Sequence, residues 1–154
     1  MAHRLKPAHK DKFGPALFWA SIVLAILGAL DSTYLLIYKL TGLNQMCIGN
    51  GGCHDVNFSV YSEFHGIPLS LIGLLAYLAI LAILLAERRM KLAADNGPLV
   101  IFGMGLVGVA YSAYLTYLEL NVIHAVCPFC VTSAIVFTLI FILAIIRLVK
   151  QTAS

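Results

Sequence analysis

Four cysteines are the residues of this 154-residue sequence whose type and spacing could do chemistry. Cys127 and Cys130 form a Cys-Pro-Phe-Cys motif, and Cys47 and Cys53 lie in a polar, glycine-rich segment. A Cys-x-x-Cys pair closes too small a loop to stabilise a fold much through chain entropy, and redox enzymes use this spacing. The motif precedes an apolar run, so a helix N-terminus should favour its thiolate form. The pattern favours redox-active thiols.

The second cysteine pair suits a relay. Thiol exchange needs one cysteine that is exposed to a partner and another that reaches the buried pair. Three glycines give the segment around Cys47 and Cys53 the freedom to move between those positions, namely Gly49, Gly51 and Gly52. We expect this pair to meet protein, and Cys130 to lie near the apolar interior, where a lipid-soluble acceptor can reach it.

Two other uses of the cysteines compete with this interpretation. Two structural disulfides would suit an oxidising compartment, and this alternative stays open. Zinc is disfavoured, because such a compartment oxidises thiolates and the Cys47–Cys53 spacing is wider than usual, although His54, His65 and His124 lie nearby. A c-type haem needs a histidine directly after the second cysteine, where Val131 stands. We expect no metal.

The composition is that of a membrane protein. Hydrophobic residues make up 61% and charged residues 11%, against roughly 45–50% and about 25% in soluble domains. Four apolar runs are each long enough to span a bilayer as a helix, at about residues 15–40, 67–86, 98–120 and 127–149. We therefore predict one all-α domain over residues 1–154, a four-transmembrane-helix bundle with a polar loop between the first two helices.

The basic residues predict the topology. Of the ten Lys and Arg residues, nine fall before the first run, between the second and third, or at the end of the fourth. Cytoplasmic loops carry the excess of positive charge, so both termini should be cytoplasmic and all four cysteines extracytoplasmic. These charges act as topology signals, so the net charge of +3 does not indicate nucleic-acid binding.

Several motifs together resemble the vitamin K epoxide reductase family, in particular its bacterial members. They are the cysteine pair Cys47 and Cys53, the Cys127-x-x-Cys130 motif, and three further groups of residues. These groups are Gly52-Cys53 followed by Val56 and Ser59, Gly66-Ile67-Pro68-Leu69 at the start of the second helix, and Gly73 and Tyr77 within it. The resemblance extends from about Phe18 to Ile146.

The resemblance implies a four-helix bundle around a quinone, in a bacterial inner membrane. By this resemblance Cys47 forms the mixed disulfide with a thioredoxin-like partner, Cys53 exchanges with Cys127, and Cys130 faces the quinone. The implied activity is that of a thiol:quinone oxidoreductase that supports disulfide bond formation.

Further site residues follow from the same resemblance. Ser59 matches a loop serine or threonine that supports the active cysteines, and Val56 accompanies it in the same motif. Tyr114 and Leu115 match a Tyr-Leu pair that lies toward the quinone pocket. We expect Val56, Tyr114 and Leu115 to join Cys130 in binding a quinone of the ubiquinone, menaquinone or vitamin K type.

The sequence departs from the family pattern in two places. Animal members that reduce vitamin K epoxide carry a tyrosine where this chain has Ala134, which favours plain quinone reduction over epoxide reduction. Many bacterial members continue into a thioredoxin-like domain, whereas this sequence stops at Ser154, so we expect a separate partner protein. Reduction of vitamin K quinone or epoxide and a non-enzymatic scaffold with two disulfides are the alternatives.

Three charged residues within the apolar runs need an explanation. We expect Asp31 to be structural, by pairing with a polar group or lying near an end of the bundle, with proton movement as the alternative. Glu119 and Lys39 are predicted near the outer interface, where charged side chains snorkel toward water.

Overall fold

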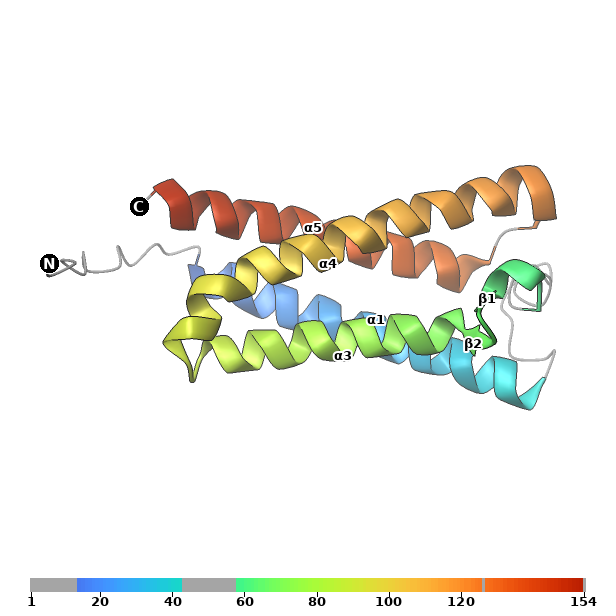
Figure 1. Cartoon of the computed structure of the whole chain (residues 1–154), viewed down its shortest axis with the longest axis horizontal. Coiled ribbons are helices and arrows are strands. Elements are labelled where there is room, and N and C mark those ends of the chain that lie inside the picture. Colours follow the sequence, from blue (N-terminus) through green and yellow to red (C-terminus); the bar gives the residue numbers. More distant parts are fainter. Residues whose placement is uncertain (1–13, 43–57, 126, 154) are drawn as a thin grey trace, which may run out of the picture.

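The fold is a bundle of four long helices. The computed structural model describes residues 14–42, 58–125 and 127–153, so Cys47, Cys53 and Val56 lie outside the described residues. The helices are α1 (Gly14–Thr41), α3 (Leu69–Glu87), α4 (Lys91–Leu118) and α5 (Pro128–Ala153). All four are long and apolar enough to cross a membrane, and Figure 1 shows them side by side along the long axis. The predicted all-α, four-span fold is confirmed.

The helices pack around a common centre in the order α1, α3, α4 and α5, and α5 packs back against α1. Helix α4 packs most extensively on α5 and α1 on α3, while the side between α3 and α4 is the least extensively packed of the four. Tyr77 of α3 crosses the centre to α5, where its ring lies 4.5 Å from that of Phe137 and its hydroxyl 2.9 Å from Ser133 Oγ. Gly28 of α1 makes room for this ring, because a Cβ there would lie 2.2 Å from it.

A tight hairpin precedes α3. Strands β1 (Glu63–Phe64) and β2 (Ile67–Pro68) pair antiparallel, with a 3-10 turn, η2 (Val60–Ser62), before them. The two residues between the strands, His65 and Gly66, have φ values of 50° and 81°, as a two-residue turn of matching twist requires. Helix α3 begins two residues later than predicted, because the expected first residue pairs within β2.

Helix α4 begins seven residues earlier than predicted, at Lys91. The Asn96-Gly97-Pro98 stretch, whose residue types commonly end helices, lies inside the helix. Asn96 Nδ2 donates to the carbonyl one turn back at 3.0 Å, and a Cβ at Gly97 would lie 2.2 Å from Glu87 Oε1. Close packing against the end of α3 thus explains the glycine, and tertiary contacts override the local breaker signal.

Candidate active site

The Cys-x-x-Cys motif sits at the N-terminus of α5, as predicted. Cys127 immediately precedes the helix and its carbonyl accepts from the Val131 amide at 3.1 Å, so Cys127 occupies the N-cap position. Pro128 follows at the first helical position, where its missing amide hydrogen leaves no helix bond unmade. Cys127 is fully buried and Cys130 is half-buried.

The Cys130 thiol and the start of α5 both favour the thiolate form of Cys127. A hydrogen bond from the Cys130 thiol holds the pKa of Cys127 below its ordinary value, against the effect of burial. The backbone amides of Cys130 and Phe129 donate to the same sulfur and act in the same direction. The thiolate, which is the attacking form of a cysteine, is therefore favoured at Cys127.

Glu119 is the charged group nearest to this motif in the turn that leads into α5. Helix α4 ends in a π-helical turn, η3 (Glu119–Ile123), closed by a bond from the Ala125 amide to the Glu119 carbonyl at 3.1 Å. The Glu119 side chain is only 3% exposed, and its carboxylate accepts a hydrogen bond from the Cys127 amide. The prediction that Glu119 snorkels to the interface is therefore wrong, since the turn buries it beside the thiols.

A small hollow lies next to Cys130, with hydroxyl and carboxyl groups in a wall that is otherwise apolar. Its volume is about 90 Å³, and Cys130, Glu119 and five serines contribute to its wall. The serines are Ser32, Ser59, Ser62, Ser70 and Ser133. We call this space the serine hollow. The predicted Ser59 thus lies in one hollow with Cys130, and its carbonyl accepts from the Ser62 hydroxyl at 2.8 Å.

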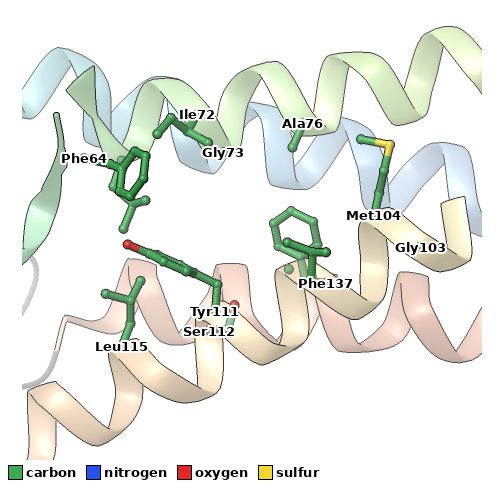
Figure 2. Close-up of a pocket in the computed structure, with 13 residues that line it drawn as sticks. Phe64, Ile72, Gly73, Ala76, Gly103, Met104, Tyr111, Ser112, Leu115 and Phe137 are labelled. Carbon is green, nitrogen blue, oxygen red and sulfur yellow. The ribbon is translucent and has the colours of Figure 1, made fainter. Parts of the chain in front are cut away.

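A larger, apolar cavity opens between α3 and α4. Its volume is about 560 Å³, and Figure 2 shows Phe64 at one end and Phe137 and Met104 toward the other. Tyr111 extends from α4 into this space, with its hydroxyl toward the end where Phe64 lies. Tyr111 and Ser112 supply polar side-chain groups to a wall that is otherwise made mostly of aliphatic and aromatic side chains. Such a cavity suits a flat, apolar ligand with few hydrogen-bonding groups.

The two spaces adjoin each other. Leu69, Gly73 and Leu115 line both the serine hollow and the apolar cavity. Leu115, which the sequence assigned to a quinone pocket, therefore forms part of the wall between Cys130 and the cavity. A ligand in the cavity would be separated from the thiol site by this shared wall alone.

The structure brings together Cys127, Cys130, Ser59 and Leu115 of the predicted site residues. Tyr114 is 51% exposed on α4 and does not line either space, although its ring lies 6.1 Å from that of Tyr111, which lines the apolar cavity. The predictions for Cys47, Cys53 and Val56 fall outside the described residues.

Sequence reasoning missed most of the cavity wall. Met104, Gly108, Tyr111 and Leu115 recur every three or four residues and so share one face of α4. This signal was present in the sequence, and it points to Tyr111 rather than to Tyr114. Phe64 had no such signal, because its position depends on the hairpin.

Two comparisons with known proteins bear on this site. Residues 19–145 match the profile described as the vitamin K epoxide reductase family. The chain is also 33% identical over 122 residues to the thiol-disulfide oxidoreductase LTO1 of Arabidopsis thaliana. That match covers 75% of this chain but 32% of the relative, so the chain spans about a third of the length of that protein.

Proposed function

This chain belongs to the vitamin K epoxide reductase family, and we propose that it is a thiol:quinone oxidoreductase of the membrane that supports disulfide bond formation. Electrons enter from a thioredoxin-like partner at Cys47 and Cys53, pass to Cys127 and Cys130, and leave to a membrane quinone. Family membership and the relative's thiol-disulfide oxidoreductase activity support the thiol chemistry.

The adjoining cavity is the observation that carries the quinone assignment. A quinone has a flat apolar ring with two carbonyl oxygens, and the apolar cavity matches it with aromatic walls and the hydroxyls of Tyr111 and Ser112. When bound, a quinone accepts two electrons and two protons and leaves as a quinol. The loosely packed side between α3 and α4 gives a hydrophobic tail a way out into lipid.

The residues of the chain divide the remaining work between them. Cys127, whose thiolate is favoured at the N-cap, exchanges with the loop pair, and Cys130 is the sulfur nearer to the cavity through the wall shared at Leu115. We place the cysteines on the extracytoplasmic side and both termini in the cytoplasm. The start of α1 and the end of α5 lie at the same end of the bundle, opposite the Cys-x-x-Cys motif, which supports this topology (Figure 1).

Filling the cavity tests the quinone assignment. Gly103 lines the apolar cavity, and a Cβ there would meet no atom within 4 Å, so a larger side chain fits without a clash but takes up ligand space. We expect Gly103→Leu to raise the KM for quinone roughly tenfold, the lower end of what a methylene of misfit does in an apolar pocket, and Gly103→Ala to raise it less.

The control variant is Ala110→Leu, which places the same leucine side chain at an exposed position of α4 outside the cavity. Quinone reduction by the dithiol-reduced protein and thiol exchange with a thioredoxin-like protein are measured for each variant. Thiol exchange should be unchanged throughout. An unchanged KM in Gly103→Leu would contradict quinone binding in this cavity.

A further inference from the structure

Glu119 is a buried carboxyl, and among the described residues no cation beside it offsets a negative charge. Placing an ionisable side chain inside an apolar bundle is unfavourable unless it is paired or has a function. Within the described part of the chain, no Lys, Arg or His forms an ion pair with Glu119, and the Cys127 amide is its hydrogen-bond donor. The amide leaves one side of the carboxyl for other partners, and that carboxyl lines the serine hollow with Cys130.

The serine hollow is suited to hold water. About 90 Å³ corresponds to roughly three water molecules at the volume that each takes up in the liquid. Ser70 Oγ is buried and has no hydrogen-bond partner among the described residues, and the other hydroxyls and the Glu119 carboxyl supply further partners. A buried water needs about two to four such polar partners.

We propose that Glu119 exchanges protons with the Cys127–Cys130 pair and passes them through the serine hollow. This inference rests on the proposed function. When the dithiol is oxidised, one S–S bond forms, two S–H bonds are broken, and two electrons and two protons leave the sulfurs. The electrons reduce a quinone to a quinol, which needs both protons. Glu119 takes one of these two protons and releases it to the hollow.

Other ionisable groups lie near the serine hollow and also affect how Glu119 and the two thiols respond to pH. Asp31 of α1 is buried and acts electrostatically on Cys130, and its Oδ2 atom has no hydrogen-bond partner among the described residues. Lys39, also of α1, donates to Ser62 at the wall of the hollow. The described groups that face Glu119 or line the hollow with it are Cys127, Cys130, Asp31, Tyr61 and Lys39.

The test replaces Glu119 with its neutral isostere, Glu119→Gln. The negative charge of Glu119 raises the pKa of Cys127, so its removal should move the pH midpoint of Cys127 alkylation downward. Alkylation of the reduced protein is followed by mass spectrometry of the Cys127 peptide and involves no quinone. We also expect the rate of Cys127–Cys130 disulfide formation on adding quinone to fall about 100-fold, within the range for general acid–base groups.

Two further variants separate proton exchange from structure. Glu119→Asp keeps a carboxyl and should recover part of the rate, whereas Asp95→Asn, on an exposed residue of α4, should leave the rate and the alkylation midpoint unchanged. An alkylation midpoint unchanged in folded Glu119→Gln would overturn the proposal, as would an Asp variant as slow as the Gln variant. A wild-type protein that reduces no quinone would refute the proposed function and leave the alkylation result to stand alone.

Discussion

Each end of the bundle buries a glutamate side chain, and the two glutamates have different partners. Glu87 at the end of α3 forms an ion pair with Arg147 of α5, and Arg147 also lies over the Phe18 ring, at 5.9 Å from its centroid. Glu119 at the other end accepts a hydrogen bond from the Cys127 amide and acts electrostatically on the two thiols. The ion pair with Arg147 therefore links α3 to α5. Glu119 has no such cation among the described residues, so its carboxyl is available for the proton exchange proposed above.

The packing around the two glutamates also differs, since Glu87 is closely packed and Glu119 borders a hollow. Gly97 of α4 lies against Glu87, and Arg88 lies 4.9 Å from the Phe18 ring centroid and 5.2 Å from that of Trp19. Glu87 lines neither the apolar cavity nor the serine hollow, whereas Glu119 lines the serine hollow. The comparison predicts that substitutions at the thiol end change activity, and that substitutions at the Glu87 end change stability.

The largest effect should come from Cys130→Ala. The variant should lose quinone reduction altogether, because Cys130 is the sulfur beside the cavity, and it should unfold at the wild-type temperature. The pKa of Cys127 should rise, since the hydrogen bond that lowers it is lost, so alkylation of Cys127 at neutral pH should slow. Normal quinone turnover in this variant would end the assignment of Cys130.

The same variant also reports on the relay. Without Cys130 as the resolving thiol, a disulfide between Cys53 and Cys127 should accumulate. Cleavage at a protease site introduced in the turn between α3 and α4, followed by non-reducing electrophoresis, would then leave the two halves linked. Halves that separate would mean that the two cysteine pairs do not meet.

At the opposite end, Glu87→Gln should lower stability without changing the chemistry. Removing one partner of a buried ion pair leaves the other charge unpaired, which costs about 3 kcal/mol. Thermal unfolding in detergent measures the loss, and quinone reduction per folded molecule should match the wild type. The double variant Glu87→Gln with Arg147→Gln should recover part of the stability. Reduced turnover per folded molecule would contradict the prediction that substitutions at the Glu87 end change stability and not activity.

Properties that depend on local sequence were predictable. Hydropathy and length predicted four helices, and the apolar run after the Cys-Pro-Phe-Cys motif predicted thiols at a helix start. The structure adds a local reason, because a proline directly after the N-cap needs no partner for its nitrogen. Leu115 was assigned to a ligand pocket through family resemblance, and it lines the cavity beside Cys130.

Properties that depend on tertiary contacts were not predictable. The Asn96-Gly97-Pro98 stretch reads as a breaker, and only its packing against Glu87 shows why the helix continues through it. Glu119 lies where α4 changes to a π turn, so the regular 3.6-residue periodicity no longer indicates which side chains face inward. The residues that line the serine hollow come from α1, η2, α3, α4, η3 and α5, which no local sequence pattern connects.

The smallest effect concerns Lys39, which was expected only to snorkel at the interface. Its Nζ atom donates to Ser62 Oγ at 2.9 Å and lies 3.1 Å from Glu63 Oε1, so it ties the end of α1 to the hairpin that carries Phe64. Glu63 is about half exposed, and exposed ion pairs contribute at most about 1 kcal/mol. Lys39→Met should therefore cost about 1 kcal/mol, and Glu63→Gln less, because the bond to Ser62 remains.

The functional consequence of this tie should be correspondingly small. Phe64 lines the apolar cavity and Ser62 the serine hollow, so a looser hairpin should raise the KM for quinone by less than tenfold, the factor that corresponds to 1.4 kcal/mol. Lys91→Met, on an exposed lysine at the start of α4, is the matched control and should change neither stability nor KM. Because the Lys39–Glu63 pair is partly exposed, the difference between Glu63→Gln and the wild type should shrink as salt is added. If Lys39→Met behaves like the Lys91 control at low salt, the hairpin is held by its turn and by packing alone, and Lys39 returns to the role of an interfacial charge.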